Sequence, residues 1–513
     1  MIKSLINKIL AKAPSKRAGA TGTAKSAKAG VPTGKRVDVP QSEHGIDPNL
    51  VDERALKVVQ TLQDAGYEAY IVGGAVRDLI LGHRPKDFDV ATNATPEQVK
   101  GLFRRAFIIG RRFRIVHVVY GRGREHEVIE VSTFRAYLDA DAAEQVTGNE
   151  KTSRKDLADK SHVIDASGRV LRDNVWGPQD QDAARRDFTV NGMYYDPSSG
   201  IVVDYHGGIK DAKKRVLRMI GDPETRYRED PVRIIRVVRF AAKLDFEIER
   251  KTRAPLQHMA ELLSNVPQSR LFDEMLKLLQ TGHAGASLAQ LRKLGLDRGL
   301  FPILDAVFDP SRKANPARDK FIELALADTD RRVAEGKSVA PSFLLACLMW
   351  HDVLDQWHAN LADGEPNFPA LQQATESVFD ARIGDISGRG KLAADMREIW
   401  TMQPRFERRI GNGPLTLVEQ PRFRAGFDFL RLRGQVGEID LALSEWWEAF
   451  SLADPTERRE LLEDAREEET AKRQARAADG DFSSAGAGSG APAKKRRRRR
   501  RKPEGSSAGP ASE

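Results

Sequence analysis

The spacing of hydrophobic residues changes along the chain, and each spacing predicts an element. Residues 53–65 place Leu56, Val59 and Leu62 at helical spacing, which is typical of an amphipathic helix. Short apolar runs bounded by glycines and charged residues follow, and these favour strands. In chain order, the next expected elements are a strand over 68–72, a short helix over 75–81 and a strand over 86–91.

A strong helix start comes next. Thr95, Pro96 and Gln98 stand at the cap, first and third positions of a helix, where Thr caps the backbone, Pro fits the first turn and Gln bonds back to the cap. This helix is expected to run to about Arg105, and two strands should follow, over 113–120 and 127–133. Helices interleaved with strands, then adjacent strands, predict an α/β or α+β domain with a mixed sheet.

The rest of the chain changes character. Residues 138–168 are polar with little periodicity and predict a mobile loop, and 183–220 predict another stretch of helices and strands. From Asp230 to about residue 450 the pattern is almost wholly helical, and 456–476 predict a charged helix. The fold class expected is therefore α+β, with a mixed sheet first, all-helical domains behind it, and a tail of Gly, Ser, Ala and basic residues that predicts disorder.

Length and composition exclude several classes of protein. A chain of 513 residues with 40% hydrophobic residues can form about two to four domains. The longest apolar run is residues 343–350, eight residues, whereas a membrane-spanning helix needs about 20. Cys347 is the single cysteine, so an intrachain disulfide and a thiolate zinc cluster are both excluded. The reducing cytoplasm is the compartment that fits this cysteine usage best.

The net charge of +9 is concentrated at the two ends of the chain. Residues 1–40 contain nine basic residues and one acidic residue, and residues 494–502 are nine consecutive Lys and Arg, followed by two acids. Without both ends, residues 41–493 have a net charge of −6. Basic arms of this kind favour a polyanion, which is either nucleic acid or an anionic membrane surface. The briefly amphipathic start, MIKSLINKIL, leaves a weak membrane-surface association open, although a disordered tail fits it better.

The sharpest chemical feature is Gly73-Gly74, then twelve residues, then Asp87-Phe88-Asp89. A glycine turn after a strand lets backbone N–H groups approach a phosphate, and the following helix start adds partial positive charge. Arg77, one turn into that helix, could pair with a phosphate through two hydrogen bonds. On a strand, Asp87 and Asp89 would point to one face and Phe88 into the core. Two adjacent carboxylates suit Mg²⁺, which leaves coordination positions for substrate phosphates.

Several ordered segments carry a family resemblance. They read YIVGGAVRDLILG (70–82), KDFDVATN (86–93), VIEVSTFR (128–135), RRDFTVNGMYYD (185–196) and REDPVRIIRVVRFAAKL (228–244). Together they resemble the class II nucleotidyltransferases, which are the bacterial poly(A) polymerases and the tRNA CCA-adding enzymes of the DNA polymerase beta superfamily. The resemblance covers about residues 55–285 and, more loosely, the helical part to about 450.

This resemblance implies a domain order and a fold. The expected head has the polymerase-beta-like nucleotidyltransferase fold, and all-helical neck and body domains follow it. The expected segments are a disordered basic arm (1–45), the catalytic head (46–215), a neck that binds the nucleotide base and RNA (216–285), an RNA-binding body (286–455), and a charged helix with a disordered basic tail (456–513).

The resemblance also implies roles for individual residues. Asp87 and Asp89 correspond to the carboxylates that bind two Mg²⁺ ions, and Asp187 corresponds to a third catalytic acid. Glu130 is another carboxylate that could face the metals, or it could instead be a structural partner of an arginine. The residues that resemble nucleotide contacts in the head are Gly73, Gly74, Arg77 and Arg186.

A second nucleotide-binding motif lies at the start of the helical region. Asp230 and Arg233 match the family's base-reading EDxxR motif, and an acceptor-only Asp beside a donor-only Arg can match both kinds of group on a base edge. Arg233, Arg236 and Arg239 recur every three residues. Because the residues between them are apolar, we expect an arginine face that lines the nucleotide site. Asp230 could instead only cap the helix that begins near Pro231.

The motifs above are shared by poly(A) polymerases and CCA-adding enzymes, so other segments must decide between them. GRRFRIVHV (110–118) and SRLFDEMLKLL (269–279) resemble poly(A) polymerase signatures, and a basic C-terminal run is familiar in that group. Such a run makes sequence-independent phosphate contacts. The RNA-binding residues expected on this basis are Arg111, Arg112, Arg114, Lys494, Lys495, Arg496, Arg497 and Arg498.

The sequence therefore predicts a Mg²⁺-dependent poly(A) polymerase that uses ATP and releases pyrophosphate without a covalent enzyme intermediate. The alternative is a tRNA CCA-adding enzyme, and a remote alternative is a non-catalytic RNA-binding protein on a transferase scaffold. Expected partners are ATP and the 3′ ends of mRNA, regulatory RNA and tRNA precursors, with RNA-degradation machinery left open.

One further segment contains candidate metal ligands. Trp350-His351-Asp352 resembles the His-Asp pair of metal phosphohydrolases. That kind of site needs further His and Asp ligands at suitable spacing, and His358 is the only histidine nearby. We therefore interpret His351 as a helical core or rim residue.

Overall fold

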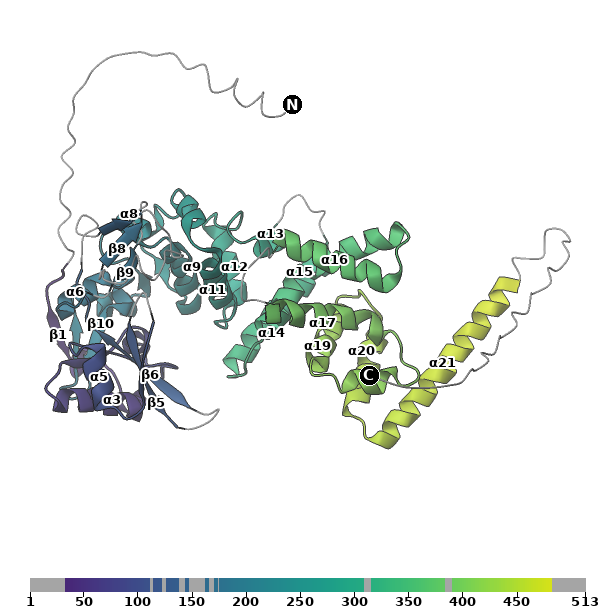
Figure 1. Ribbon diagram of the computed structural model, residues 1–513, viewed down its shortest axis with the longest axis horizontal. Helices are drawn as coiled ribbons and strands as arrows, with labels where there is room; N and C mark the ends of the chain where they lie inside the picture. The colour runs from purple at the N-terminus through teal and green to yellow at the C-terminus, as the bar shows by residue number, and fades with distance from the viewer. Residues whose placement is uncertain are drawn as a thin grey trace, which may run out of the picture. The chain divides into compact units, whose positions relative to one another are not determined.

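The protein is described by a computed structural model. The described residues are 33–110, 114–121, 126–137, 144–146, 162–165, 170–173, 175–308, 315–382 and 390–481. The chain divides into two compact units, Met1–Arg397 and Glu398–Glu513, and each unit is considered by itself. Figure 1 shows a sheet-containing part in the first half of the chain and helices in the second half.

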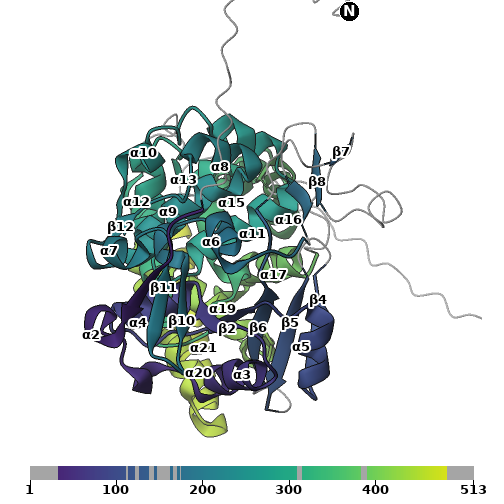
Figure 2. The same ribbon diagram turned by 90° about the vertical axis from the view of Figure 1, so that its left-hand side faces the viewer.

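One eight-stranded mixed sheet forms the head, with the strand order β1-β11-β10-β2-β3-β6-β5-β4 (Figure 2). All neighbouring strands in it are antiparallel except β3 and β6, which run parallel. This arrangement confirms the predicted mixed sheet. The strands are β1 (Val37–Pro40), β2 (Ala69–Val72), β3 (Asp89–Thr92), β4 (Ala106–Ile109), β5 (Ile115–Tyr120), β6 (Glu127–Thr133), β10 (Met193–Asp196) and β11 (Ile201–Asp204).

Two helices cover one face of this sheet, and a second, smaller core packs on part of the other face. Helix α3 (Glu53–Asp64) packs on β2 and β3, and α5 (Pro96–Leu102) packs on β4 and β5. The predicted cap of α5 is confirmed, because Thr95 and Gln98 bond reciprocally to each other's backbone. The core beneath both helices is built from alternate strand residues such as Val90 and Val131. Strand residues of the other parity therefore face away from this core.

Two edges of the sheet differ from the sequence predictions. Residues 1–45 were expected to form a disordered arm, but β1 pairs with β11 and α2 (Gln41–His44) follows it, so the fold begins by Val37. Strand β4 was not predicted either. Both are short edge strands, and their pairing partners lie elsewhere in the chain, where local spacing cannot indicate them.

The stretch expected to be a mobile loop, 138–168, also contains regular structure. Strands β7 (Glu144–Val146) and β8 (His162–Asp165) pair in parallel, and β9 (Val170–Asp173) adds to β8 to complete a three-stranded sheet. The prediction of a loop was therefore wrong for these residues. The other residues between 138 and 161 lie outside the described part of the chain.

Helices dominate after β11, as predicted. Helix α9 (Val232–Leu244) contacts both α11 and α12, and buries Ile234, Ile235, Val237 and Val238. The other helices that the described residues form in the first unit are α4 (Gly74–Ile80), α6 (Gln179–Arg185), α7 (Gly208–Lys213), α8 (Pro223–Glu229), α10 (Arg250–Arg253), α11 (Gln268–Leu279), α12 (Ala284–Lys293), α13 (Pro302–Phe308), α14 (Pro316–Ala334), α15 (Pro341–Ala362) and α16 (Asn367–Arg382). A short parallel pair of strands, β12 (Val216–Leu217) and β13 (Glu247–Ile248), flanks α9.

The second unit has its own aromatic core. Phe406, Phe423, Trp447 and Phe450 pack together in it, and the Trp447 indole donates to the backbone oxygen of Phe406. Its helices are α17 (Gly390–Phe406), which begins in the first unit, α18 (Gly413–Val418), α19 (Phe423–Gln435), α20 (Leu441–Leu452) and α21 (Pro455–Asp481). Helix α21 confirms the charged helix predicted over 456–476.

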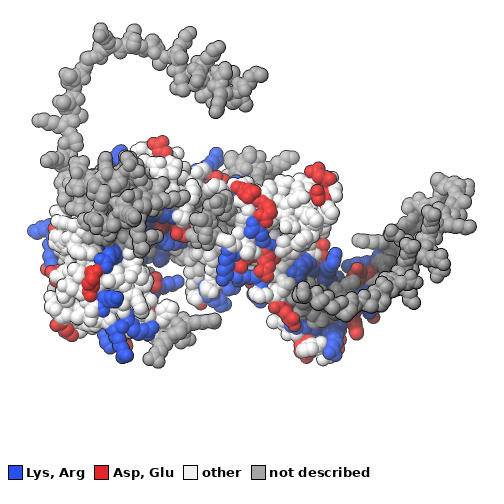
Figure 3. Space-filling model, viewed as in Figure 1, with Lys and Arg blue, Asp and Glu red and all other residues white. Residues whose placement is uncertain are grey.

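Charge on the described surface is mixed. Figure 3 shows Lys and Arg interspersed with Asp and Glu over the visible face. No helix of the described residues has both the length and the apolar character needed to cross a membrane.

Candidate active site

The predicted glycine turn after the strand is present, and it has a backbone conformation that needs glycine. Gly73 caps α4 directly after β2, with φ +73° and ψ −135°, a conformation that is essentially restricted to glycine. A methyl group at Gly73 would lie 3.5 Å from Nη1 of Arg186 and 3.9 Å from Oδ2 of Asp89. The turn therefore brings bare backbone against one cation and one carboxylate of the predicted site.

The acidic pair lies beside this turn, with one change from the prediction. Asp89 is the first residue of β3, but Asp87 precedes the strand, so the two carboxylates do not share a regular strand as expected. Phe88 is buried, as predicted. Asp89 stands opposite Glu130 in the parallel β3–β6 register. The structure thus brings Asp87, Asp89 and Glu130 into one acidic neighbourhood.

The acidic neighbourhood is short of positive charge. Desolvation among the surrounding protein atoms raises the pKa of Asp89 to about 6, and the charges of Glu130 and Asp87 add to this, while Arg186 acts in the opposite direction. A carboxyl group in such surroundings gains from a bound cation. Within the described ranges, no group of three or more His, Cys, Asp and Glu side chains is arranged to hold a metal ion. The residues therefore fit a divalent cation by charge, without a complete set of ligands already in place.

Asp187, the predicted third acid, is tied to the neck. Its Oδ2 accepts hydrogen bonds from both Nε and Nη2 of Arg236, the first at 2.9 Å, and its Oδ1 accepts from the backbone N–H of Phe188 and from Asn191. Burial alone would raise the pKa of this carboxyl group, but Arg236 and the other donors hold it at about 2. Asp187 is therefore ionised at neutral pH, and its two hydrogen bonds from Arg236 tie it to α9.

Arg77 is built into the same network. It is 2% exposed, and its guanidinium donates to Oδ1 of Asp78 and, over 2.7 Å, to Oδ1 of Asn191. Asn191 in turn donates to Asp187. Arg77 lies on α4, and Asp187 is bonded to Arg236 of α9. A continuous series of hydrogen bonds therefore links the helix after the glycine turn to the arginine face. Sequence spacing gave no indication of Asn191.

The EDxxR residues have separate partners. Nη1 of Arg233 donates to Oε2 of Glu229 over 3.0 Å and to the backbone oxygen of Arg226. Asp230 accepts from Nη2 of Arg270 over 2.9 Å, which links the motif to the 269–279 segment in α11. Pro231 is the N-cap residue of α9. The carboxylate of Asp230 is thus paired with α11, and the alternative that it caps α9 stays a prediction.

Positive charge accumulates behind this motif. Burial together with the charges of Arg135, Arg226 and Arg233 lowers the pKa of Arg185 to about 9. Burial and the charge of Arg233 lower the pKa of Arg226 to about 10, although the charge of Glu229 offsets part of this lowering. Guanidinium groups that repel one another in this way favour an anion between or beside them. Of this cluster, only Arg233 was predicted from the sequence.

One aromatic ring organises the arginine face. The guanidinium carbons of Arg77, Arg236 and Arg239 lie 5.8, 5.3 and 4.5 Å from the centre of the Phe240 ring. Phe188 packs edge-on against the same ring. Three of the predicted nucleotide contacts are thus gathered around Phe240.

Two predicted arginines of the site, Arg239 and Arg186, have further acidic or aromatic partners. Arg239 is also 3.8 Å from Glu274 of α11. Arg186 lies over the ring of Tyr194 and donates hydrogen bonds to Tyr194 and Asp182. Both guanidinium groups are therefore held in place from more than one side.

The predicted RNA-binding residues are only partly described. Arg114 pairs with Glu97 of α5, on the helix-covered side of the sheet. Arg111, Arg112 and the run Lys494, Lys495, Arg496, Arg497 and Arg498 lie outside the described residues. The RNA-binding role of all these residues stays a prediction.

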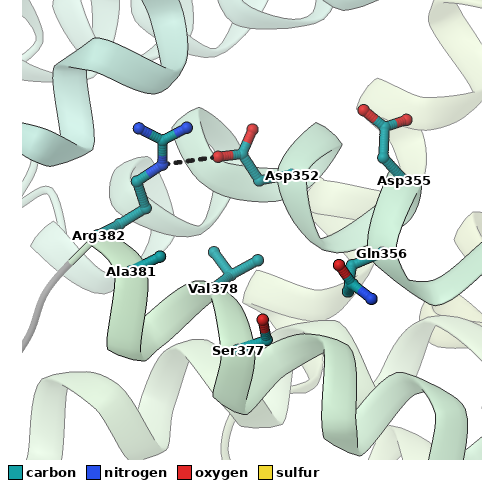
Figure 4. A pocket seen from close by; sticks show the side chains of 7 residues that line it. All are labelled: Asp352, Asp355, Gln356, Ser377, Val378, Ala381 and Arg382. Carbon is teal, nitrogen blue, oxygen red and sulfur yellow. Dashed lines mark hydrogen bonds and ion pairs between the residues drawn. The ribbon is translucent and has the colours of Figure 1, made fainter. Parts of the chain in front are cut away.

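The Trp350-His351-Asp352 segment lies in α15, at a cavity of about 360 Å³ between α15 and α16 (Figure 4). His351 is buried and meets the ring of Phe321 edge-on. Asp352 accepts a hydrogen bond from Nε of Arg382, which reaches across from α16. This agrees with the interpretation of His351 as a core residue.

Comparison with known proteins gives the family. The model of the poly A polymerase head domain matches residues 69–218, that of the "probable RNA and SrmB-binding site of polymerase A" matches 245–308, and that of the arginine-rich C-terminus of polymerase A matches 363–503. Poly(A) polymerase I of Salmonella typhi is 40% identical over 438 residues, which is 85% of this chain and 90% of that protein. The chain belongs to the bacterial poly(A) polymerase I family.

Similarity within this family extends well beyond the catalytic head. Poly(A) polymerase I of Haemophilus influenzae is 41% identical over 82% of this chain and 90% of its own length. A CCA-adding enzyme of Lactobacillus helveticus is 37% identical over only 44% of this chain and 49% of its own length. The chain thus matches poly(A) polymerases through its helical half, whereas this CCA-adding enzyme is a partial relative.

Proposed function

We propose that this protein is a polynucleotide adenylyltransferase that extends RNA 3′ ends with AMP from ATP, without a template. The observation that carries the proposal is the acidic neighbourhood of Asp87, Asp89 and Glu130 against the Gly73 turn, in a chain that belongs to the poly(A) polymerase I family throughout most of its length. In the reaction the RNA 3′ oxygen forms a bond to the α-phosphorus of ATP. The bond from the α-phosphorus to the oxygen that bridges it to the β-phosphorus breaks, and pyrophosphate leaves. The proton of the RNA 3′ hydroxyl passes to the solvent.

The acids have different parts in this proposal. Asp87 and Asp89 would hold Mg²⁺, and Glu130 is the next nearest acid in the sheet register. Asp187 is a poorer ligand in this arrangement because its oxygens already accept from Arg236, Asn191 and Phe188. Bound Mg²⁺ supplies charge stabilisation for the reacting oxygens and the triphosphate.

The cations have the complementary part. Arg186 faces the Gly73 turn beside Asp89, and Arg236 and Arg239 project from α9 around Phe240. Arg186 and Arg239 suit the triphosphate of ATP, because guanidinium groups pair with phosphate oxygens through two hydrogen bonds. Arg236 already donates from both Nε and Nη2 to Asp187, so its part in the proposal is to position the other arginines. Arg77 is buried and already bonded, so its part in the proposal is to position the others rather than to contact phosphate.

Substituting the acidic pair tests the catalytic assignment. Asp87→Asn and Asp89→Asn should each lower AMP addition by at least about a thousandfold, because each removes charge from the site at which the reaction is stabilised. Asp64→Asn is a matched control, since Asp64 is an exposed acid at the end of α3. Near-normal activity in a folded Asp87 or Asp89 variant would contradict the assignment.

The preferred nucleotide distinguishes polyadenylation from CCA addition. The observation that supports CCA addition is the partial similarity to the CCA-adding enzyme of Lactobacillus helveticus. Each nucleoside triphosphate would be supplied singly with Mg²⁺, on an unstructured RNA and on a tRNA that lacks its terminus. We expect long ladders with ATP alone on both RNAs. Addition that needs CTP, occurs only on the tRNA and stops after three residues would instead establish a CCA-adding enzyme.

The wider setting is proposed on the same basis. The family's RNA-binding and arginine-rich segments support RNA 3′ ends as the partner, with mRNA, regulatory RNA and tRNA precursors as substrates in the cytoplasm. An association with RNA-degradation machinery, or with a membrane surface through the N-terminal arm, stays a prediction that rests on the basic ends of the sequence alone.

A further inference from the structure

The open face of the sheet carries a continuous row of side chains away from the catalytic acids. Asp89 of β3 stands opposite Glu130 of β6, Glu130 opposite His117 of β5, and His117 opposite Phe107 of β4. Residues directly opposite in neighbouring strands share a face. Nε2 of His117 lies 3.2 Å from Oε1 of Glu130, which shows that these two side chains meet.

This row ends in exposed apolar side chains. Phe107 is 55% exposed and Ile109 is 37% exposed, although both lie in a regular strand. Their neighbours Ala106 and Ile108 point to the other face, where Ala106 joins the core beneath α5 and Ile108 packs against it. In β4 the core therefore receives the small alanine, while the large aromatic residue faces outward.

We propose that this face binds the RNA just upstream of its 3′ end, with a base stacked on Phe107. The inference rests on the proposed function, because it takes the acidic end of the row as the place where the 3′ hydroxyl reacts. Single-stranded nucleic acid is held by aromatic side chains on which bases stack, combined with nearby positive charge. Phe107 supplies the ring, and the exposed Arg104 lies three residues before it.

The geometry defines which base reaches Phe107. Three steps between neighbouring strands separate Asp89 from Phe107, and at about 4.8 Å per step this is about 14 Å. A stacked strand advances about 3.4 Å per nucleotide, so the distance corresponds to about four nucleotides. An RNA that leaves the acidic pair along the row therefore places its fourth or fifth base from the 3′ end on Phe107.

Continuity with the catalytic acids favours RNA over other occupants of this face. A second copy of the chain, or another protein, would gain from burying the apolar strip but would gain nothing from its continuity with Asp89 and Glu130. An RNA whose end reacts at those acids must leave along some surface, and the row β6–β5–β4 is a sheet surface that begins there.

The first test compares RNA length. Phe107→Ala should raise the KM for a 15-nucleotide RNA about tenfold, which is the size expected for one lost stacked base. The KM for ATP, and the KM for a three-nucleotide RNA that ends before Phe107, should stay within about twofold of wild type. Leu102→Ala is the matched control, because Leu102 is also an exposed apolar side chain of the head, at 37%, but lies in α5. Phe107→Tyr should behave like wild type, since it keeps the ring.

The second test observes the stacked base directly. RNAs that carry 2-aminopurine four or five nucleotides from the 3′ end should show quenched fluorescence with the wild-type protein and recover it with Phe107→Ala. A label twelve nucleotides from the end should not respond to the substitution. Equal effects at every label position, or equal effects of Phe107→Ala on long and three-nucleotide RNAs, would overturn the proposal.

Two other results would be decisive. If the wild-type protein extends RNA with ATP but Phe107→Ala, folded by thermal melting, binds RNA normally, this inference fails and the proposed function stands. If the wild-type protein adds no AMP at all, the proposed function itself fails. A dimer that forms in solution and is abolished by Phe107→Ala would assign the face to a second copy and overturn the RNA proposal.

Discussion

Single residues of the site are held by pairs that reach far along the chain. Asp187 is fixed by Arg236, and Arg77 is fixed by Asn191, which also donates to Asp187. Through these contacts the buried, ionised Asp187 and the guanidinium groups of Arg77 and Arg236 connect the head to α9. The pair Asp87 and Asp89, proposed to be catalytic, differs, because Asp89 keeps a raised pKa among other acids. The contrast separates an acid used for positioning from acids available to a cation.

Asp187→Asn should show what the pair with Arg236 contributes to stability. The folded pKa of about 2 lies below the ordinary value of 3.8, so the ionised form stabilises the fold at neutral pH by about 2 kcal/mol. This contribution is complete above about pH 4, falls to about half near pH 3 and is lost as the pH approaches 2. Denaturant unfolding of the wild type and the variant at several pH values measures it.

A double-mutant cycle controls for the origin of that effect. In an Arg236→Met background, Asp187→Asn should cost much less, because the partner is already gone. An equal cost in both backgrounds would mean that the effect does not come from the pair.

Phe240→Leu should loosen the arginine face. The ring holds Arg77, Arg236 and Arg239, and each cation–π contact contributes about 0.5–1 kcal/mol. We expect the KM for ATP to rise about tenfold, with the KM for RNA nearly unchanged. Phe246→Leu is the control, because Phe246 is also buried but lies beyond the end of α9. A similar rise in both variants would point to general loosening of the neck.

Several candidate site residues could be predicted from the sequence, because their signals depend on residue type and short spacing. The glycine turn, the acidic pair and the arginine repeat on α9 are of this kind. The partner of each residue could not be predicted. Asp187 and Arg236 are 49 residues apart, and Arg77 and Asn191 are 114 apart, so only the folded chain brings them together.

At the scale of elements, the proposed active site is a junction between a strand, a turn and a helix. Gly73 must adopt a backbone conformation with positive φ so that β2 can pass directly into α4. That sharp passage keeps the turn close to Asp89 and Arg186. The turn and the cap at Thr95 were predicted correctly because their signals are local. Strands β1 and β4 were missed because they are edge strands, which depend on their partners more than on their own residues.

A comparison of Gly73→Ala with Gly82→Ala should separate the effect of backbone strain on stability from the effect of the turn on AMP addition. Both glycines have positive φ, and Gly82 follows α4 with open space around it. Each substitution should cost about 1–3 kcal/mol of stability. Only Gly73→Ala should also reduce AMP addition strongly, because its methyl group stands beside Arg186 and Asp89. Equal activity in the two variants would exclude a role for the turn in catalysis.

For the whole molecule, the distribution of charge is the main feature. The region between the ends is mildly acidic, and its described surface mixes both signs, whereas nine consecutive cations stand near the C-terminus. Affinity for RNA should therefore come largely from the ends, and selectivity for the 3′ hydroxyl from the head.

Deletion of residues 485–513 tests this division. RNA binding should weaken, and the slope of log K against log salt should flatten by up to about six, since each phosphate contact with single strands contributes about 0.7. The affinity for ATP should not change. Titrations at several salt concentrations measure the slope, and an unchanged slope would refute the role of the tail.

Strand β1 has a consequence for how the head is completed during synthesis. Val37 pairs with Asp204, which the ribosome adds 167 residues later. At roughly 5–20 residues per second, β1 waits about 10–30 s for its partner. The other strands of the sheet are made in the meantime. Of the strands in this sheet, β1 is therefore the earliest to leave the ribosome and among the last to be paired.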